Sequence, residues 1–461
     1  MKTMTRWAVC LALCAWCAVQ GAQAADAAKA MSFDECKAVL EKLKTDGNIK
    51  QYKLDPGAEA GLLKLDLSNS GIIDLASLKG MPLEWLHIDG NDHSPSMVVT
   101  LAGLEGMPLK ELSLQGNVAL EDVSAIKGAP MKVFKINGTH GGSPKVKDIG
   151  ALKGMDLVEA AIGAPVEDLS PLAAMKLEKV YLGTASKDVN VLKGMPLKSV
   201  HLAGAVTNIS GLKGLQLTTI SLHGASALSD IGPLAGMPLT SIDLVNAGNI
   251  SDLGPLKGMK FTGLCIPSKV MDLGPLAGMP LQSLELNSTK VTDLGPLKEM
   301  TQLRSLSLPT PVTDLGPLKG LKLTSINACE CRALSDIGPL AGMPLESLNL
   351  MNTKVADISA LKGMPLKGLY LNSTLSGQPV PVTDLSPLKG LPLKGLNITC
   401  NSDPRALDLS PVAECKVLES FNVTPNDKTK GFNTLRKHPA LKTINGQPVA
   451  EFFKKLDEDK K

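Results

Sequence analysis

The chain has 461 residues, with 48 Lys and Arg against 45 Asp and Glu, a net charge of +3, and an aromatic content of 3%. Both signs of charge are spread evenly along the chain, which argues against the concentrated basic surface that nucleic acids or anionic membranes require. After residue 24 no stretch reaches the roughly 18 to 20 apolar residues of a membrane helix, so we expect no nucleic-acid partner and no membrane insertion.

Residues 1–24 have the layout of an export signal peptide. Lys2 and Arg6 supply the positive start, Trp7 to Val19 is apolar, and an Ala-Gln-Ala cleavage site ends at Ala24. Cleavage there removes two cations, leaving 46 basic (48 − 2) against 45 acidic residues, a net charge of +1. We therefore predict an exported protein that is periplasmic, on the cell surface or extracellular.

Six cysteines remain after the signal, and their spacing gives neither a disulfide framework nor a CxxC metal pair. We expect mostly unpaired thiols and no cofactor. These cysteines are Cys36, Cys265, Cys329, Cys331, Cys400 and Cys415.

Residues 25–60 are predicted to form an N-terminal helical cap. Ser32-Phe-Asp-Glu35 is a capping box, and the residues after it are apolar at helical spacing. We expect Cys36, Val39, Leu40 and Leu43 to face the protein core.

From residue 61 to 430 one repeat recurs, most clearly in Leu281 to Leu297. Counting from the Asp of its Asp-Leu-Gly/Ser-Pro-Leu phrase, the spacing is 20 to 27 residues, within the 20 to 29 of leucine-rich repeats. The phrase starts at Asp74, Asp122, Asp148, Asp168, Asp188, Asp230, Asp252, Asp272, Asp293, Asp314, Asp336, Asp357, Asp384 and Asp408, and Thr100, Asn208 and Gly431 take the same place in degenerate copies.

Each part of the repeat predicts a local structure. Leu284-Glu285-Leu286 alternates like a short strand with its leucines inward. Asp293 can accept backbone N–H bonds and Pro296 fixes φ, so one short helical turn begins there. A methionine follows the turn in most repeats, where core filling explains it better than copper binding. Capping likewise explains the Asp positions better than calcium binding.

Stacked repeats of this kind predict an α/β leucine-rich-repeat solenoid, with a parallel sheet on the concave face and short 3-10 or helical turns on the convex face. Residues 431–461 are expected to form the last repeat and a C-terminal helical cap. Leu441 to Ile444 is a final strand there, and Val449 to Leu456 an amphipathic helix.

The Val-Thr-Asp-Leu-Ser-Pro-Leu phrase at Val382–Leu388 resembles internalin-type bacterial leucine-rich repeats, over about Leu62 to Ile444. The closing segment Leu441–Phe453 is similar to the ends of repeat arrays in planctomycete-type bacterial proteins. The usual Asn of the family's descent is present as Asn91 and Asn117, but Thr289, Thr353 and Thr374 take its place in other repeats. The resemblance implies a binding protein and does not name its ligand.

The concave strand face usually contacts the partner in proteins with this resemblance. Its central outward position is mostly small and polar here, which argues against an aromatic-rich carbohydrate groove along most of the array. The densest group of larger side chains is predicted on neighbouring repeats, and two further candidates lie beyond it. These residues are Lys179, Tyr181, His201, His223 and Asp243, followed by Glu285 and Tyr370.

Four insertions lengthen the descent between strand and turn. Insertions at one part of a repeat gather along one edge, where they either carry binding or are tolerated surface variation. They are Asp89–Val99, Asn137–Val146, Asn372–Val382 and Thr399–Leu407.

We predict a protein-binding module rather than an enzyme, acting through its concave strand face and inserted loops. A glycan or cell-wall binder is the first alternative. A metal-dependent hydrolase centred on His201, His223 and Asp243 is the second, although no nucleophile or phosphate-loop spacing supports catalysis. The fold alone cannot choose among ligands.

Overall fold

The computed structural model describes residues 30–138, 142–375, 380–400 and 405–458. The chain divides into two compact units, Met1–Ser186 and Lys187–Lys461. The predicted export signal and the first residues of the predicted N-terminal cap lie outside the described residues.

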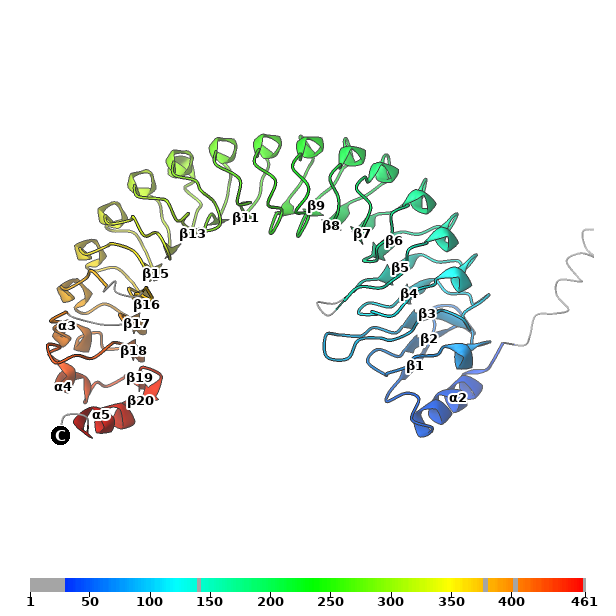
Figure 1. Cartoon of the computed structure of the whole chain (residues 1–461), viewed down its shortest axis with the longest axis horizontal. Coiled ribbons are helices and arrows are strands. Elements are labelled where there is room, and N and C mark those ends of the chain that lie inside the picture. The colour runs from blue at the N-terminus through cyan, green and yellow to red at the C-terminus, as the bar shows by residue number, and fades with distance from the viewer. Residues whose placement is uncertain (1–29, 139–141, 376–379, 401–404, 459–461) are drawn as a thin grey trace, which may run out of the picture. The chain divides into compact units, whose positions relative to one another are not determined.

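The first unit opens with helix α2 (Phe33–Thr45) and strand β1 (Lys53–Pro56), which pairs antiparallel with β2 (Leu63–Asp66). Every later strand of the unit pairs parallel with the strand before it, one repeat earlier in the chain. Figure 1 shows these strands along one face and the short helical turns along the opposite face. The strands are β3 (Leu83–His87), β4 (Glu111–Ser113), β5 (Val133–Ile136), β6 (Glu159–Ile162) and β7 (Lys179–Thr184).

The second unit repeats the same pattern with strands mostly of three residues and ends with an antiparallel pair, β19 with β20. The strands are β8 (Ser199–Gly204), β9 (Thr219–Ser221), β10 (Ser241–Asp243), β11 (Gly263–Cys265), β12 (Ser283–Glu285), β13 (Ser305–Ser307), β14 (Ser325–Asn327), β15 (Ser347–Asn349), β16 (Gly368–Tyr370), β17 (Gly395–Asn397), β18 (Ser420–Asn422), β19 (Thr443–Ile444) and β20 (Gln447–Pro448). The helices are α3 (Ser410–Ala413), α4 (Phe432–Leu435) and α5 (Val449–Glu458).

Most repeats carry one 3-10 turn after the descent from the strand. In the first unit the turns are Ala76–Leu78, Ser124–Ile126, Gly150–Leu152 and Ser170–Leu172. In the second they are Asn190–Leu192, Ser210–Leu212, Gly232–Leu234, Gly254–Leu256, Gly274–Leu276, Gly295–Glu299, Gly316–Leu318, Gly338–Leu340, Ser359–Leu361 and Ser386–Leu388.

The predicted role of the repeated Asp is confirmed. Asp293 Oδ1 accepts the backbone N–H of Gly295 at 2.7 Å, and Asp357 Oδ1 accepts that of Ser359 at 2.8 Å. The backbone and hydroxyl donors of Ser359 lower the pKa of Asp357, so the carboxylate stays charged and keeps the turn capped.

The core of each unit is a stack of leucines, with a buried methionine after the turn in most repeats. Leu284, Leu286 and Leu297 have no exposed surface, and Met279 is 4% exposed. The methionines that follow the turn are buried, for example Met81 at 1% and Met364 at 3% exposure, as predicted for core filling. The residues on either side of each buried strand leucine point the other way and form the exposed surface of the sheet.

Both predicted caps are confirmed within the described residues. Ser32 and Glu35 form the reciprocal capping box of α2, which buries Cys36 and Leu40. At the other end α5 buries Phe452 and Phe453, and the Arg436 guanidinium lies 4.5 Å from the Phe453 ring centre. The antiparallel strands β1 and β20, which add to these caps, were not predicted from the repeat. No helix in the described part of the chain is long and apolar enough to cross a membrane.

Candidate functional site

On the strand face, many outward side chains are already used by the fold. Asn327, Asn349 and Asn397 each end a strand, and each Oδ1 accepts the backbone N–H two residues further on, at 3.1, 2.9 and 3.1 Å. Asp243 and Asp66 do the same at 2.9 and 2.8 Å. These Asx turns satisfy the N–H group where the strand ends. This position therefore selects a short acceptor side chain for structural reasons.

Proline removes the need for such a cap in two repeats. Cys265 and Ser307 occupy the same position, and the residues two further on are Pro267 and Pro309, which have no N–H group. The small polar character of the strand face is thus largely a consequence of backbone satisfaction.

The predicted residues His201, His223 and Asp243 lie near one another in the second unit. His223 Nδ1 is 3.4 Å from Asp243 Oδ2, and the two side chains are 50% and 42% exposed. Ser221 Oγ also donates to Asp243 Oδ2, at 3.2 Å. Burial lowers the pKa of His201, the Asp243 charge opposes that shift, and His223 adds to it. An exposed pair of this kind is worth about 0 to 1 kcal/mol.

This group does not have the geometry of a metal centre. Among the residues that the structure describes, no three His, Cys, Asp or Glu side chains are arranged to hold a metal ion. Glu285 lies one strand beyond Cys265 in register, and contributes to raising the pKa of that thiol, although burial contributes more. The metal-dependent alternative therefore has no support in the geometry.

The buried thiols are poor nucleophiles. Burial raises the pKa of Cys331 to about 12 and that of Cys415 to about 11. A thiol with such a pKa stays protonated at neutral pH and does not react readily. Cys36, Cys265 and Cys329 are free thiols as well, in agreement with the prediction.

Lys179 and Tyr181 belong to β7 of the first unit. Lys179 is exposed and in register with Glu159, while Tyr181 is half-buried. The Tyr181 ring lies over two glycines, because a Cβ added at Gly183 or Gly163 would come within 3.2 or 3.5 Å of it. Both glycines also line an open hollow of about 560 Å³.

This hollow adjoins one predicted insertion, Asn137–Val146. The residues that line it are Ser143, Pro144, Lys145, Lys147, Gly163, Ala164, Pro165, Gly183, Thr184 and Ala185. The described end of the insertion and the two glycines beside the Tyr181 ring therefore line one hollow.

A second cluster was missed from the sequence and lies on β3 and β4 of the first unit. The Trp85 and His87 rings stack at 3.5 Å between centres with 22° between their planes. His87 Nε2 lies 2.8 Å from Glu111 Oε1, and His87 Nδ1 lies 3.7 Å from Asp89 Oδ2. Asp89 Oδ1 in turn accepts the Ser113 hydroxyl at 2.6 Å. We call these five residues the Trp85 cluster.

The Trp85 cluster is fixed by its neighbours yet open to solvent. The side chains of His87, Asp89 and Glu111 are 20%, 25% and 28% exposed. Its signal in the sequence was an outward Trp followed two residues later by His on the same strand. The carboxylate of Glu111 comes from the next repeat, 24 residues away, so the contact depends on the register between repeats.

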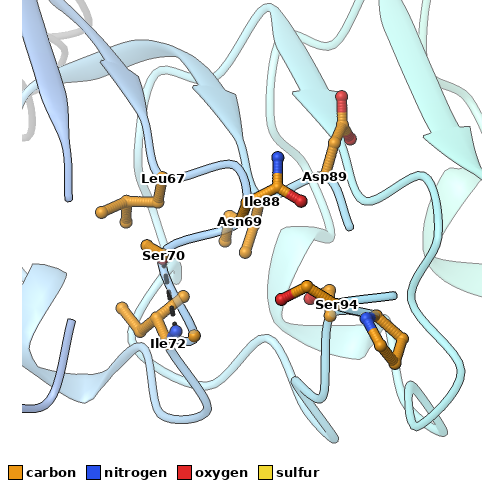
Figure 2. Close-up of a pocket in the computed structure, with 10 residues that line it drawn as sticks. Leu67, Asn69, Ser70, Ile72, Ile88, Asp89 and Ser94 are labelled. Carbon is orange, nitrogen blue, oxygen red and sulfur yellow. Dashed lines mark hydrogen bonds between the residues drawn. The ribbon is translucent and has the colours of Figure 1, made fainter. Parts of the chain in front are cut away.

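Behind this cluster the chain encloses a small polar cavity of about 10 Å³ between two neighbouring repeats, roughly the room for one water molecule. Figure 2 shows Asn69, Ser70 and Ile72 on one side of it and Asp89 and Ser94 on the other. Ser70 Oγ accepts the N–H of Ile72 at 3.3 Å there. This cavity is structural, and it is too small for an organic ligand.

Repeated strand, descent and 3-10 turn around one leucine core define the chain as a leucine-rich-repeat solenoid, as predicted. No protein-family model matches the chain, and no curated protein does. Among solved structures it is similar to an internalin, inlF, from Listeria monocytogenes, at 22% identity and a TM-score of 0.48, over 65% of this chain and 84% of that one.

Two further solved structures are similar to the chain. One is the functional domain of InlJ from Listeria monocytogenes, which includes a cysteine ladder; identity is 17% and the TM-score 0.40, over 78% of this chain and 74% of that one. The other is a leucine-rich-repeat protein of Leptospira interrogans, at 18% identity and a TM-score of 0.41, over 88% of this chain and 98% of that one. The likeness concerns the fold.

Proposed function

We propose that this chain is an exported, non-enzymatic protein-binding module whose partner contacts the strand face of the first unit. The observation that carries the proposal is the Trp85 cluster. An aromatic ring, an imidazole and two carboxylates stand together there on neighbouring strands. Trp is among the residue types that dominate binding energy in protein interfaces.

The hydrogen bonds of the cluster favour binding because they reduce the side-chain entropy that is lost when a partner binds. Glu111 and Asp89 already hold His87, and Trp85 already stacks on it. Association normally immobilises rotamer-rich side chains at about 0.5 to 1.5 kcal/mol each. Side chains that are held before the partner arrives avoid most of that cost.

The surface continues along the first unit toward Tyr181. Lys135 Nζ on β5 pairs with Glu159 Oε1 on β6 at 2.8 Å, and the hollow beside Tyr181 lies on the same side as the Asn137–Val146 insertion. A partner that spans both would use the strand face and an inserted loop together. Lys179 stands at the outer edge of this surface.

Export is part of the proposal and is supported by residues 1–24 of the sequence. The similarity of Leu441–Phe453 to planctomycete-type repeat arrays is part of the proposal as an expectation about the source organism. Periplasm, cell surface and extracellular medium all suit a chain without a membrane-spanning helix in its described part.

The test is a pull-down from envelope and secreted fractions with the chain lacking residues 1–24. Trp85→Ala removes the aromatic ring, and Glu111→Gln removes the charge while keeping the shape of the side chain. Each variant should lose the partner. Glu346→Gln is the matched control, because Glu346 belongs to the second unit and forms an exposed ion pair with Lys367 at 2.7 Å. Equal capture by all four proteins would place the partner elsewhere and end this proposal.

A further inference from the structure

A β-bulge at the start of β3 brings Trp85 onto the strand face. Strands β2 and β3 begin in register, but Lys64 then lies opposite Trp85, so Glu84 is an extra residue in β3. Without the extra residue Trp85 would stand opposite the buried Leu65, on the inward side of the sheet. Bulges of this kind re-aim side chains and are common beside functional sites.

Glu84, the extra residue, anchors the bulge. Its carboxylate accepts the backbone N–H of Ala58 and lies 3.5 Å from the Lys110 ammonium, and the residue is only 4% exposed. Lys110 also pairs with Glu59, so two carboxylates share its charge. The bulge is therefore a fixed feature of β3, and it sets the outward direction of Trp85.

Three carboxylates lie around His87. Asp66 is in register with it on the neighbouring strand, and Asp89 and Glu111 lie 3.7 and 2.8 Å from its two ring nitrogens. Among the described residues none of the three forms an ion pair with a lysine or an arginine. Asp66 Oδ2 and Glu111 Oε2 accept no hydrogen bond in that part of the chain, so both remain open to a donor from a partner.

The lysines on the neighbouring strands only partly balance these carboxylates. Lys53, which lies opposite Asp66, binds Asp55 at 2.8 Å, and Lys135 is likewise paired with an acid. Lys64 forms no ion pair with the residues that the structure describes. Three carboxylates without a lysine or arginine partner thus stand against one free lysine, and the face around the Trp85 cluster carries an excess of negative charge.

Charge is also divided unevenly between the two units. Residues 25–186 contain 17 Lys and Arg against 22 Asp and Glu, a net charge of −5, whereas residues 187–461 contain 29 against 23, a net charge of +6. The near-neutral total conceals this difference, so the even spread expected from the sequence does not hold at the level of the units. An acidic unit attracts cationic partners and repels anionic ones.

We propose that the face around the Trp85 cluster binds a basic segment of a protein, rich in arginine and lysine. The inference rests on the protein-binding function proposed above and names the chemistry of the partner. A guanidinium or ammonium group of that segment contacts the Trp85 indole, because Trp is the best cation–π acceptor among the side chains. The same groups donate charge-assisted hydrogen bonds to Asp66 and Glu111. A neutral or acidic segment gains neither contact.

The test is fluorescence anisotropy of the chain lacking residues 1–24 with two labelled decapeptides, one alternating Arg with Ala and one alternating Glu with Ala. The basic peptide should bind and the acidic one should not, and added salt should weaken the binding. Asp66→Asn and Glu111→Gln should each weaken it by about two- to five-fold, the size of one exposed ion pair. Asp66→Asn keeps the acceptor that caps the Ser68 N–H group, so it should fold like the parent.

Asp243→Asn is the matched control. Asp243 makes the same strand-end cap on the second unit, and its substitution should leave peptide binding unchanged. The inference would be overturned if the basic peptide did not bind, if both peptides bound equally, or if Asp66→Asn and Glu111→Gln bound like the parent. A protein captured through Trp85 without peptide binding would leave the proposed function standing with a partner of another charge. Peptide binding without any captured protein would contradict the proposed function and leave the charge preference of this face intact.

Discussion

At the scale of single residues, short acceptors stabilise two places of the repeat, the 3-10 turn and, in several repeats, the end of the strand. An Asp caps the 3-10 turn, and an Asn or Asp frequently caps the end of the strand. Both accept a backbone N–H two residues further on, as at Asp293 and Asn349. Part of the strand face is therefore committed to structure, whereas Tyr181, His201 and Tyr370 occupy the strand-end position without a short acceptor side chain.

Replacing one turn cap should destabilise its own repeat. Asp293→Ala removes the acceptor of the Gly295 N–H bond, and loss of such a cap costs about 1 kcal/mol. Urea unfolding followed by circular dichroism measures the change in the free energy of unfolding. Asp293→Asn retains an acceptor oxygen and should lose clearly less; equal losses would show that charge, and not the hydrogen bond, is responsible.

His438 should make the C-terminal end of the second unit sensitive to acid. Its Nε2 lies 3.0 Å from the carbonyl of Cys415, while Nδ1 accepts the N–H groups of Ala440 and Leu441 at 3.3 and 3.1 Å. Burial lowers the pKa of His438, and the Cys415 carbonyl only partly offsets this. The folded state therefore holds the neutral imidazole.

Because the pKa is lower in the folded state, the unfolded chain takes up a proton first as the pH falls. Stability is thus complete above the ordinary histidine pKa of about 6.5 and is lost as the pH falls below it. The protection factors of residues 415–456 in hydrogen exchange, which correct for the slower intrinsic exchange at low pH, should fall between pH 7.5 and 5.5. His438→Gln cannot titrate, so its protection factors should not show this fall; the same fall in that variant would assign the effect to another group.

At the scale of elements, the two ends of the array are closed by a helix and an antiparallel strand. The interior repeats find a neighbour on both sides, but a terminal repeat has one open side. Helix α5 covers that side at the C-terminus with Phe452 and Phe453, which lie at 8% and 3% exposure. The end helix is therefore more than a continuation of the repeat.

Removing one ring from this cap should loosen the last repeat. Phe453→Ala deletes a buried aromatic side chain, which costs about 3 kcal/mol or more, and also removes the contact with Arg436. Thermal unfolding and hydrogen exchange of residues 441–458 would report the change. Phe33→Ala is the matched control at the other end, since Phe33 is 39% exposed and should lose little. Equal effects of the two variants would show that α5 does not act as a lid.

At the scale of the whole molecule, export should leave a defined N-terminus. Intact mass spectrometry of the protein recovered from envelope or medium of an expressing bacterium should match a chain that begins at Ala25. Ala24→Leu disturbs the small-x-small site and should shift or slow the cleavage. Recovery of the full-length chain from the cytoplasm alone would contradict both the signal and the location proposed for this protein.

The sequence by itself determined the fold class, because each repeat contacts mainly its neighbours. The pattern that specifies the repeat is therefore contained in about 22 consecutive residues. The Asp caps, the methionine core, the capping box at Ser32 and the closing helix all follow from such local patterns. The antiparallel strands β1 and β20 do not belong to the repeat and were missed.

Only the tertiary structure decided which outward side chains are available for binding. Asn327 and Tyr370 occupy the same position of the repeat, yet one is held by a cap and the other is exposed. His87 meets Glu111 across one repeat because uneven insertions still leave their strands in register. Contacts of this kind depend on pairing between segments far apart in the chain, and no local pattern encodes that pairing.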